Sequence, residues 1–303
     1  MSQPPLDVIF HIGAHKTATT HLQHSIGNVS DLLASEGVQF FGPQSLRANG
    51  KRLEARFSLP FNPRKSNADG RPAEVVLEEM VQGGHRLVLS EENFIGVLFD
   101  SARKGPKCRL GYPIYAQAGD RLAALAEKIA PDGFHICLGI REPAMFLNSA
   151  YGQALLAGYV IPEAKFMLHN PLRGIDWAEL VTRLRATPGV RHLTVWRQED
   201  YAACLDQILT VMLGDAARHV VPIKRTVNPG LSQEAVAFAL KMKRAGHAGP
   251  LAQLARDEYP IGPTSPVYQG YDEEARALSR EFYDLQVDAL SRMEGVTLLR
   301  PQG

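Results

Sequence analysis

The chain has 303 residues, of which 45% are hydrophobic and 21% charged, and its net charge is +1. Such a composition belongs to an ordinary globular protein and excludes a disordered or fibrous chain, while the balanced charge argues against a general nucleic-acid binder. No apolar run approaches the roughly 20 residues that span a bilayer, and the first residues lack the features of a signal peptide. The cysteines Cys108, Cys137 and Cys204 are isolated, which is typical of a reducing compartment. We therefore expect a cytoplasmic protein without a membrane span.

Short apolar runs alternate with amphipathic helical patterns along the chain. The expected strands cover residues 6–12, 37–41, 86–90, 134–140 and 192–197. The expected helices cover residues 19–35, 73–83, 119–130, 143–157, 176–187, 201–213, 231–245 and 272–293. This alternation predicts one α/β domain over residues 1–303, with a central parallel sheet flanked by helices and a ligand site at the carboxyl ends of the strands.

Three long segments, 42–72, 96–118 and 246–271, are rich in Gly and Pro and lack periodicity. Loops of this length in a compact domain are usually functional, so we expect them to lie over the ligand site. The first carries seven basic residues against two acidic ones, and the second carries four basic residues with Tyr112 and Tyr115 close behind. Such residues suit an acidic or sugar-containing ligand. Solvated loop charges with no ligand are an equally open interpretation.

The segment after the first strand predicts a cradle for a phosphate or sulfate group. The apolar run breaks at Gly13 and gives way to small and hydroxylated residues, with Lys16 inside the turn and a helical pattern beyond. Such a turn points backbone N–H groups and the positive end of a helix at one spot. Lys16 would add a full charge, and Thr17, Thr19 and Thr20 would add hydroxyl donors. A threonine-capped helix is the alternative, but it needs neither the lysine nor so many hydroxyls.

The nucleotide-binding pattern G-x-x-x-x-G-K-[ST] does not match, because Lys16 comes three residues after Gly13. The run His15-Lys16-Thr17-Ala18-Thr19-Thr20 instead resembles the P/H-K-[ST]-G-T-[ST] loop of sulfotransferases that use 3′-phosphoadenosine 5′-phosphosulfate (PAPS), with alanine in place of the usual glycine. In this family the loop holds the 5′-phosphosulfate. The resemblance implies that this group contacts His15, Lys16, Thr17, Ala18, Thr19, Thr20 and His21.

A second motif follows the strand expected over 134–140. Arg141, Pro143, Ser149 and Tyr151 have the spacing R-x-P-x-x-x-x-x-S-x-Y, which is also the pattern of this family for the 3′-phosphate. An arginine at a strand end offers a planar fork to a phosphate, and proline is favoured in the first turn of the following helix. The resemblance implies that Arg141 and Ser149 bind the 3′-phosphate.

Two further patches agree more weakly with this family. Residues 192–201 resemble the strand that ends in an E-D dipeptide near the adenine, where Trp196 could stack on the base or belong to the core. Residues 225–232 resemble an R-x-N-x-S-L segment of bacterial members, which makes Arg225 a candidate for donor binding.

Transfer of a sulfuryl group to a hydroxyl or amine needs a base for the acceptor proton and a positive group at the bridging oxygen. Lys16 suits the second task. For the first, aligning Glu92-Asn93 with the E-N dipeptide of the family selects Glu92, with Glu91 second. The alternative is that both glutamates merely begin a helix, where its dipole favours them. His15 and His11 are further candidates by proximity.

The resemblance implies a PAPS-dependent sulfotransferase with the P-loop-like fold of this family, which releases 3′-phosphoadenosine 5′-phosphate (PAP). We expect no metal, although His11, His15, His21 and His24 lie close in sequence, because no H-E-x-x-H is present and the donor needs none. The acceptor is a small molecule or glycan, a carbohydrate being one candidate. The alternatives are an ATP-dependent phosphotransferase, which would need Mg²⁺, and a non-catalytic nucleotide- or glycan-binding protein. The acceptor and the oligomeric state stay open.

Overall fold

The computed structural model describes residues 5–48, 52–62, 65–99, 108–224 and 229–302. Its centre is a six-stranded sheet with the order β2-β3-β1-β4-β5-β6, in which all neighbouring strands are parallel. The strands are β1 (Asp7–His11), β2 (Val38–Phe41), β3 (Arg86–Ser90), β4 (Phe134–Ile140), β5 (Val190–Arg197) and β6 (Val296–Leu299). The expected α/β class with a central parallel sheet is confirmed.

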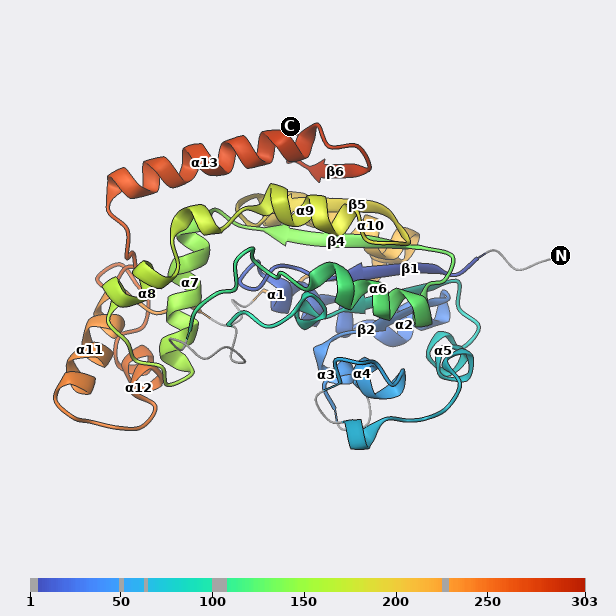
Figure 1. Cartoon of the computed structure of the whole chain (residues 1–303), viewed down its shortest axis with the longest axis horizontal. Helices are drawn as coiled ribbons and strands as arrows, with labels where there is room; N and C mark the ends of the chain where they lie inside the picture. The colour runs from blue at the N-terminus through green and yellow to red at the C-terminus, as the bar shows by residue number, and fades with distance from the viewer. Residues whose placement is uncertain (1–4, 49–51, 63–64, 100–107, 225–228, 303) are drawn as a thin grey trace.

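Helices cover both faces of this sheet (Figure 1). The helices on the two faces are α1 (Thr19–Gly27), α2 (Ser30–Ser35), α5 (Ala73–Val81), α6 (Ala118–Ile129), α9 (Trp177–Arg185) and α10 (Tyr201–Leu213). Buried side chains of α5, α6 and α9 pack on the face that contains Phe10 of β1, and those of α1, α2 and α10 pack on the face that contains Ile9. Successive side chains of a strand point to opposite faces, so a strand covered on both sides must be apolar throughout.

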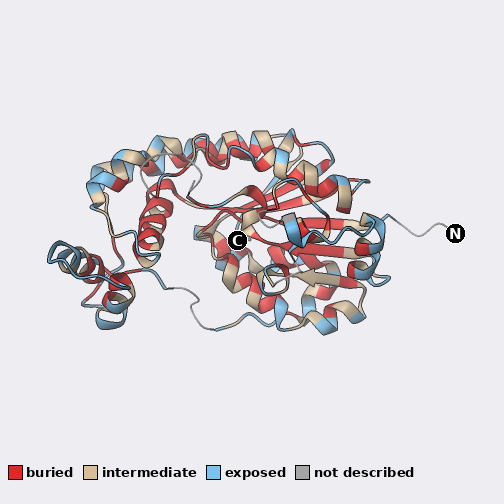
Figure 2. Cartoon of the chain, turned by 60° about the horizontal axis from the view of Figure 1, so that its bottom comes forward, coloured by how far each residue is buried: buried red, intermediate tan, exposed pale blue. Residues whose placement is uncertain are grey.

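Another group of helices lies beyond the carboxyl ends of the strands, at the left of Figure 1. It consists of α7 (Pro143–Leu156), α8 (Glu163–His169), α11 (Gln233–Arg244) and α12 (Leu251–Glu258). The long helix α13 (Glu273–Ser291) then runs back from α7 past α9 to β6. Burial is densest in the strands and in the inner faces of the helices, while exposed residues gather around α11 and α12 (Figure 2). In the part of the chain that is described, no helix is both long and apolar enough to cross a membrane.

Several short elements depart from the sequence-based expectation. The helix expected over 19–35 is two helices, because the chain breaks at Gly27-Asn28, a pair of weak helix formers. The short helices α3 (Pro43–Leu46) and α4 (Leu53–Arg56) occupy the first long segment, and α12 occupies the third. The strand β6 and the helix α8 were also not expected. These elements have four to eight residues, too few to show a periodic pattern in the sequence.

Candidate active site

The loop between β1 and α1 is attached to both neighbouring strands. The strand β1 lies between β3 and β4, so the segments that follow these three strands meet at one edge of the sheet. The N–H of Ala14 donates to the carbonyl of Gly139 at 3.1 Å, and the N–H of Glu91 donates to the carbonyl of His11 at 3.0 Å. At Gly13, where φ is +20°, an added Cβ would lie 2.3 Å from the Thr19 Cγ2 atom. The tight turn therefore requires a glycine at this position.

The interior of the loop is braced by its own residues. The hydroxyl of Thr17 donates to the carbonyl of Ala14 at 2.6 Å, and its side chain is buried. This hydroxyl supports the loop and is not a free donor for a ligand. Lys16 and Ala18 both adopt left-handed backbone conformations, with φ of 69° and 63°. The usual glycine of the family would adopt this conformation without strain at position 18, whereas alanine adopts it at a cost.

Lys16 is the cation of the loop. Its ammonium group has no ion pair within the described residues, although its side chain is mostly buried. Burial lowers the pKa of Lys16, the nearby Arg141 charge lowers it further, and Glu92 opposes both effects. A buried cation without a counter-ion is the arrangement that an anionic ligand would complete.

Arg141 joins the second motif to the first. It follows β4 directly, and its Nη1 donates to the backbone carbonyl of Lys16 at 3.0 Å. Its Nε is buried without a partner in the described part of the structure. The indole Nε1 of Trp177 donates to the Arg141 carbonyl at 2.7 Å, and the Glu142 carboxylate caps α7 by accepting from the N–H of Ala144. The segment after β4 is therefore held by several hydrogen bonds, and the buried Nε of the Arg141 guanidinium is left without a partner in the described structure.

Ser149 lies on α7, six residues after the first helical position. Its side chain is half-buried and makes no hydrogen bond with any described residue. Six residues of α-helix rise about 9 Å, so Ser149 and Arg141 can share a ligand only if it lies along the helix.

The two glutamates after β3 have different environments. Glu91 is buried and accepts two hydrogen bonds from Arg47, both at 2.7 Å, and further bonds from the backbone and side-chain nitrogens of Asn93. Glu92 accepts one bond from Arg47 at 3.0 Å, while its Oε2 is buried without a partner in the described structure. Burial alone would raise the pKa of Glu92, but the neighbouring charges of His15 and Arg47 outweigh it, and the pKa is lowered.

His15 packs against a tyrosine from the second long segment. The two rings stack with centroids 5.7 Å apart, and the Tyr115 hydroxyl lies 2.9 Å from the His15 Nδ1. The same hydroxyl accepts a bond from the backbone N–H of His15, and the Asn93 side chain also hydrogen-bonds to the His15 ring. Burial lowers the pKa of His15, although Glu92 opposes this effect.

His11 is part of the core beneath the loop. It is 1% exposed, and its Nδ1 lies 2.7 Å from the Ser90 hydroxyl. Burial lowers its pKa to about 4, with Glu92 opposing. A buried neutral ring of this kind is a supporting residue and not a base for an acceptor.

Two of the residues expected near the donor have side chains that are engaged within the fold. Trp196 is 1% exposed and stacks on the His11 ring at 5.7 Å, so both residues support the loop from below and Trp196 presents no face to an adenine. His21 uses both ring nitrogens within the fold, one with the Tyr201 hydroxyl and one with the Ile223 carbonyl, each at 2.8 Å. Its side chain is therefore not available to a phosphosulfate. Arg225 lies outside the described residues.

The basic loop residues also differ from expectation. Arg47 pairs with Glu91 and Glu92, and Arg71 pairs with Asp69 and Glu79. Their charge is therefore partly neutralised within the fold. Neither Arg47 nor Tyr115 was assigned to the site from the sequence, although both lie in segments that stood out by composition.

Comparisons with known proteins give a weak structural match. No family model matches it, and no curated protein does. A crystal structure of a sulfotransferase from Alicyclobacillus acidocaldarius is 18% identical, with a TM-score of 0.40, and the match covers 84% of this chain and 97% of that one. A likeness at this level indicates no function for this chain.

Proposed function

We propose that the protein transfers a sulfuryl group from PAPS to a hydroxyl or amine of a small-molecule or glycan acceptor. The hydrogen bond between Arg141 and the Lys16 carbonyl carries this proposal, because it brings the two phosphate motifs to one place. A donor with anionic groups at both its 5′ and 3′ positions suits two adjacent cations from different strands. An ATP-dependent phosphotransferase would have no use for a separate 3′-phosphate site.

In this proposal, different residues bind the 5′ and 3′ ends of PAPS. Lys16 and the backbone N–H groups of the loop hold the 5′-phosphosulfate, with Thr19 and Thr20 as hydroxyl candidates. The Arg141 guanidinium and the Ser149 hydroxyl hold the 3′-phosphate. No step of this assignment requires a metal.

Glu92 is the base in this proposal. Its lowered pKa keeps the carboxylate ionised at neutral pH, and its unpartnered Oε2 can accept a proton. As the acceptor oxygen bonds to sulfur, its proton moves to Oε2 and the bond from sulfur to the phosphate oxygen breaks. PAP then leaves with the electron pair on that oxygen, where the Lys16 ammonium stabilises the charge. Glu91 keeps Arg47 and Asn93 in place beside this base.

The substitution Arg141→Gln tests the use of this donor. We expect PAPS affinity to fall about tenfold to a hundredfold, because a charge-assisted contact contributes roughly 1.5–3 kcal/mol. Binding of ATP with Mg²⁺ should be weak in both proteins. If ATP with Mg²⁺ bound tightly, and Arg141→Gln left that affinity and the PAPS affinity unchanged, the chain would instead be a phosphotransferase candidate.

A further inference from the structure

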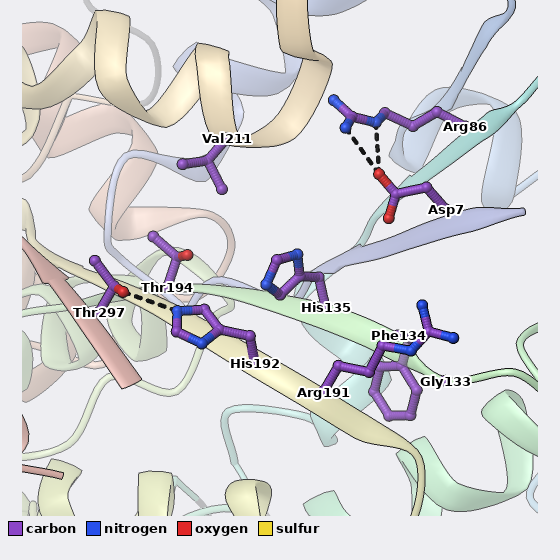
Figure 3. Close-up of a pocket in the computed structure, with 10 residues that line it drawn as sticks. All are labelled: Asp7, Arg86, Gly133, Phe134, His135, Arg191, His192, Thr194, Val211 and Thr297. Carbon is purple, nitrogen blue, oxygen red and sulfur yellow. Dashed lines mark hydrogen bonds and ion pairs between the residues drawn. The ribbon is translucent and has the colours of Figure 1, made fainter. Parts of the chain in front are cut away.

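A cavity lies at the opposite edge of the sheet from the candidate active site. It has a volume of about 430 Å³ and is lined by residues at the amino ends of the strands, with Val211 of α10 above them (Figure 3). The proposed sulfotransferase reaction does not use any of these residues.

The charged residues of this cavity are predominantly basic. Arg86 and Arg191 line it, and Asp7 is its only carboxylate. The Asp7 Oδ2 is already held by Arg86 at 2.8 Å, so the negative charge is paired. Arg191 has no carboxylate partner among the described residues and donates to the backbone carbonyl of Asp132. An added Cβ at Gly133 would lie 2.7 Å from the Arg191 Nε, so glycine leaves room for the guanidinium to cross the edge of the cavity.

Two histidines stand beside these arginines. His135 and His192 are register partners on β4 and β5, and their ring centroids are 5.1 Å apart. The Nε2 of His192 is bonded to the Thr297 hydroxyl at 2.8 Å, whereas the Nε2 of His135 is buried without a partner in the described structure. Figure 3 shows the two rings side by side below Val211. A buried polar atom without a partner leaves a hydrogen bond for a ligand to supply.

The charged groups around His135 are mostly cationic. Burial lowers the pKa of His135, and the charges of His192, Arg86 and Arg191 lower it further, with only Asp7 opposing. Burial also lowers the pKa of His192, together with the charge of Arg185. The two arginines would repel a cation at this place, whereas they would attract an anion.

We propose that this cavity binds the phosphate or sulfate group of a small organic anion, with Arg191 and His135 as its main contacts. Cavities of roughly 300–1,000 Å³ accommodate organic ligands, so a single tetrahedral ion would leave most of this one empty. The bound anion raises the pKa of both histidines.

The test combines calorimetry with histidine side-chain NMR on the full chain, with inorganic phosphate and glycerol 3-phosphate as probes. Lys16→Ala serves as the background, so that the loop of the candidate active site does not contribute. Arg191→Gln is the diagnostic variant, Arg191→Lys keeps the charge, and Arg292→Gln is the control because this arginine is exposed at the end of α13. His135→Asn assigns the resonance.

We expect glycerol 3-phosphate to raise the pKa of His135 and to bind more tightly than inorganic phosphate. Arg191→Gln should weaken its binding about tenfold, Arg191→Lys less, and Arg292→Gln not at all. Equal binding of the two probes would contradict the organic ligand. The site would be overturned if the His135 and His192 resonances did not change on addition of the probes. It would also be overturned if Arg191→Gln left the affinity unchanged. None of these results depends on whether the chain uses PAPS.

Discussion

Two adjacent carboxylates at the end of β3 have separate tasks. Glu91 is enclosed by Arg47 and Asn93, whereas Glu92 has an unpartnered oxygen beside the Lys16 loop. Sequence alone could select this pair but not divide it, because the division depends on Arg47, which lies more than forty residues away in a segment without periodicity. In the proposed reaction, Glu91 holds Arg47 and Asn93 in position, and Glu92 takes up the acceptor proton.

Substitution of each glutamate by glutamine separates the two tasks. Glu92→Gln should lower the rate of sulfate transfer about a hundredfold or more, the usual contribution of a general base, without changing PAP affinity or stability. Glu91→Gln should destabilise the fold by about 1–2 kcal/mol, since it loses a charged pair of which Arg47 is 43% exposed. Labelled PAPS with a panel of sugars and phenols measures the first effect, and urea unfolding measures the second. Equal rates for Glu92→Gln and the parent protein would remove Glu92 as the base.

Ala18 carries backbone strain that a glycine would relieve. Its φ of 63° lies in the left-handed region, which costs an L-residue about 1–2 kcal/mol. Because glycine also has more freedom in the unfolded chain, Ala18→Gly should raise the free energy of unfolding by a net amount of roughly 0.5–1 kcal/mol. Urea unfolding of the two proteins gives this difference directly, and a loss of stability would show that the alanine methyl group contributes packing instead.

His11 makes the fold sensitive to acid. The pKa of His11 is about 4 in the folded state. Between about pH 6.5 and pH 4, the unfolded chain therefore binds a proton that the folded chain does not bind. Stability from this group is complete above pH 6.5 and is lost as the pH falls, by about 2 kcal/mol between pH 7 and pH 5.

The variant His11→Asn isolates this contribution, because asparagine can keep the bond to Ser90 without titrating. Its free energy of unfolding should fall less between pH 7 and pH 5 than that of the parent, even if the variant is less stable at pH 7. Parallel pH profiles would assign the acid sensitivity to other groups.

At the scale of elements, the loop fits closely against the end of β4. A Cβ added at Gly139 would lie 2.9 Å from the Thr17 hydroxyl oxygen and 3.1 Å from the Trp196 Nε1. The sequence shows this glycine only as an interruption of an apolar run. Its role depends on a loop and a strand that are distant in sequence, so the requirement for glycine could not be predicted.

Gly139→Ala should therefore destabilise the protein by about 1–3 kcal/mol and weaken PAP binding, because the loop must move away from β4. Gly152→Ala is the matched control. Its added Cβ would have contacts only at 4.0 Å, with Leu231, and the site lies inside α7, where alanine is favoured by up to about 1 kcal/mol. Thermal unfolding of both variants measures this difference. Equal stability of Gly139→Ala and Gly152→Ala would contradict the account.

Side chains of α13 also support the segment that follows Arg141. The Ser279 hydroxyl bonds with Glu142 and accepts from the N–H of Ala144, and Gln286 accepts from the N–H of Trp177 at 2.7 Å. The expected helix over 272–293 is confirmed, but its contacts could not be predicted from periodicity. The sequence does not show which residues the polar side chains on the buried face of this helix would bond.

At the scale of the whole molecule, the position of the site could be predicted better than its details. Both motifs follow apolar strands of a parallel sheet, so they had to lie at one edge. The strand order that makes them neighbours, with β1 between β3 and β4, is a property of the folded chain. The single domain over the whole chain stays a prediction. The cavity at the other edge had no sequence motif, since its histidines and arginines come from separate strand starts.

The measurement that tests the central claim most directly is a calorimetric titration with PAP, with adenosine 5′-phosphate as the control and without added metal. If the Lys16 loop and Arg141 hold the two ends of the donor, PAP should bind at least about tenfold more tightly than adenosine 5′-phosphate, the difference coming from the 3′-phosphate. Equal binding of the two nucleotides, or binding of neither, would contradict the assignment of this edge of the sheet to PAPS.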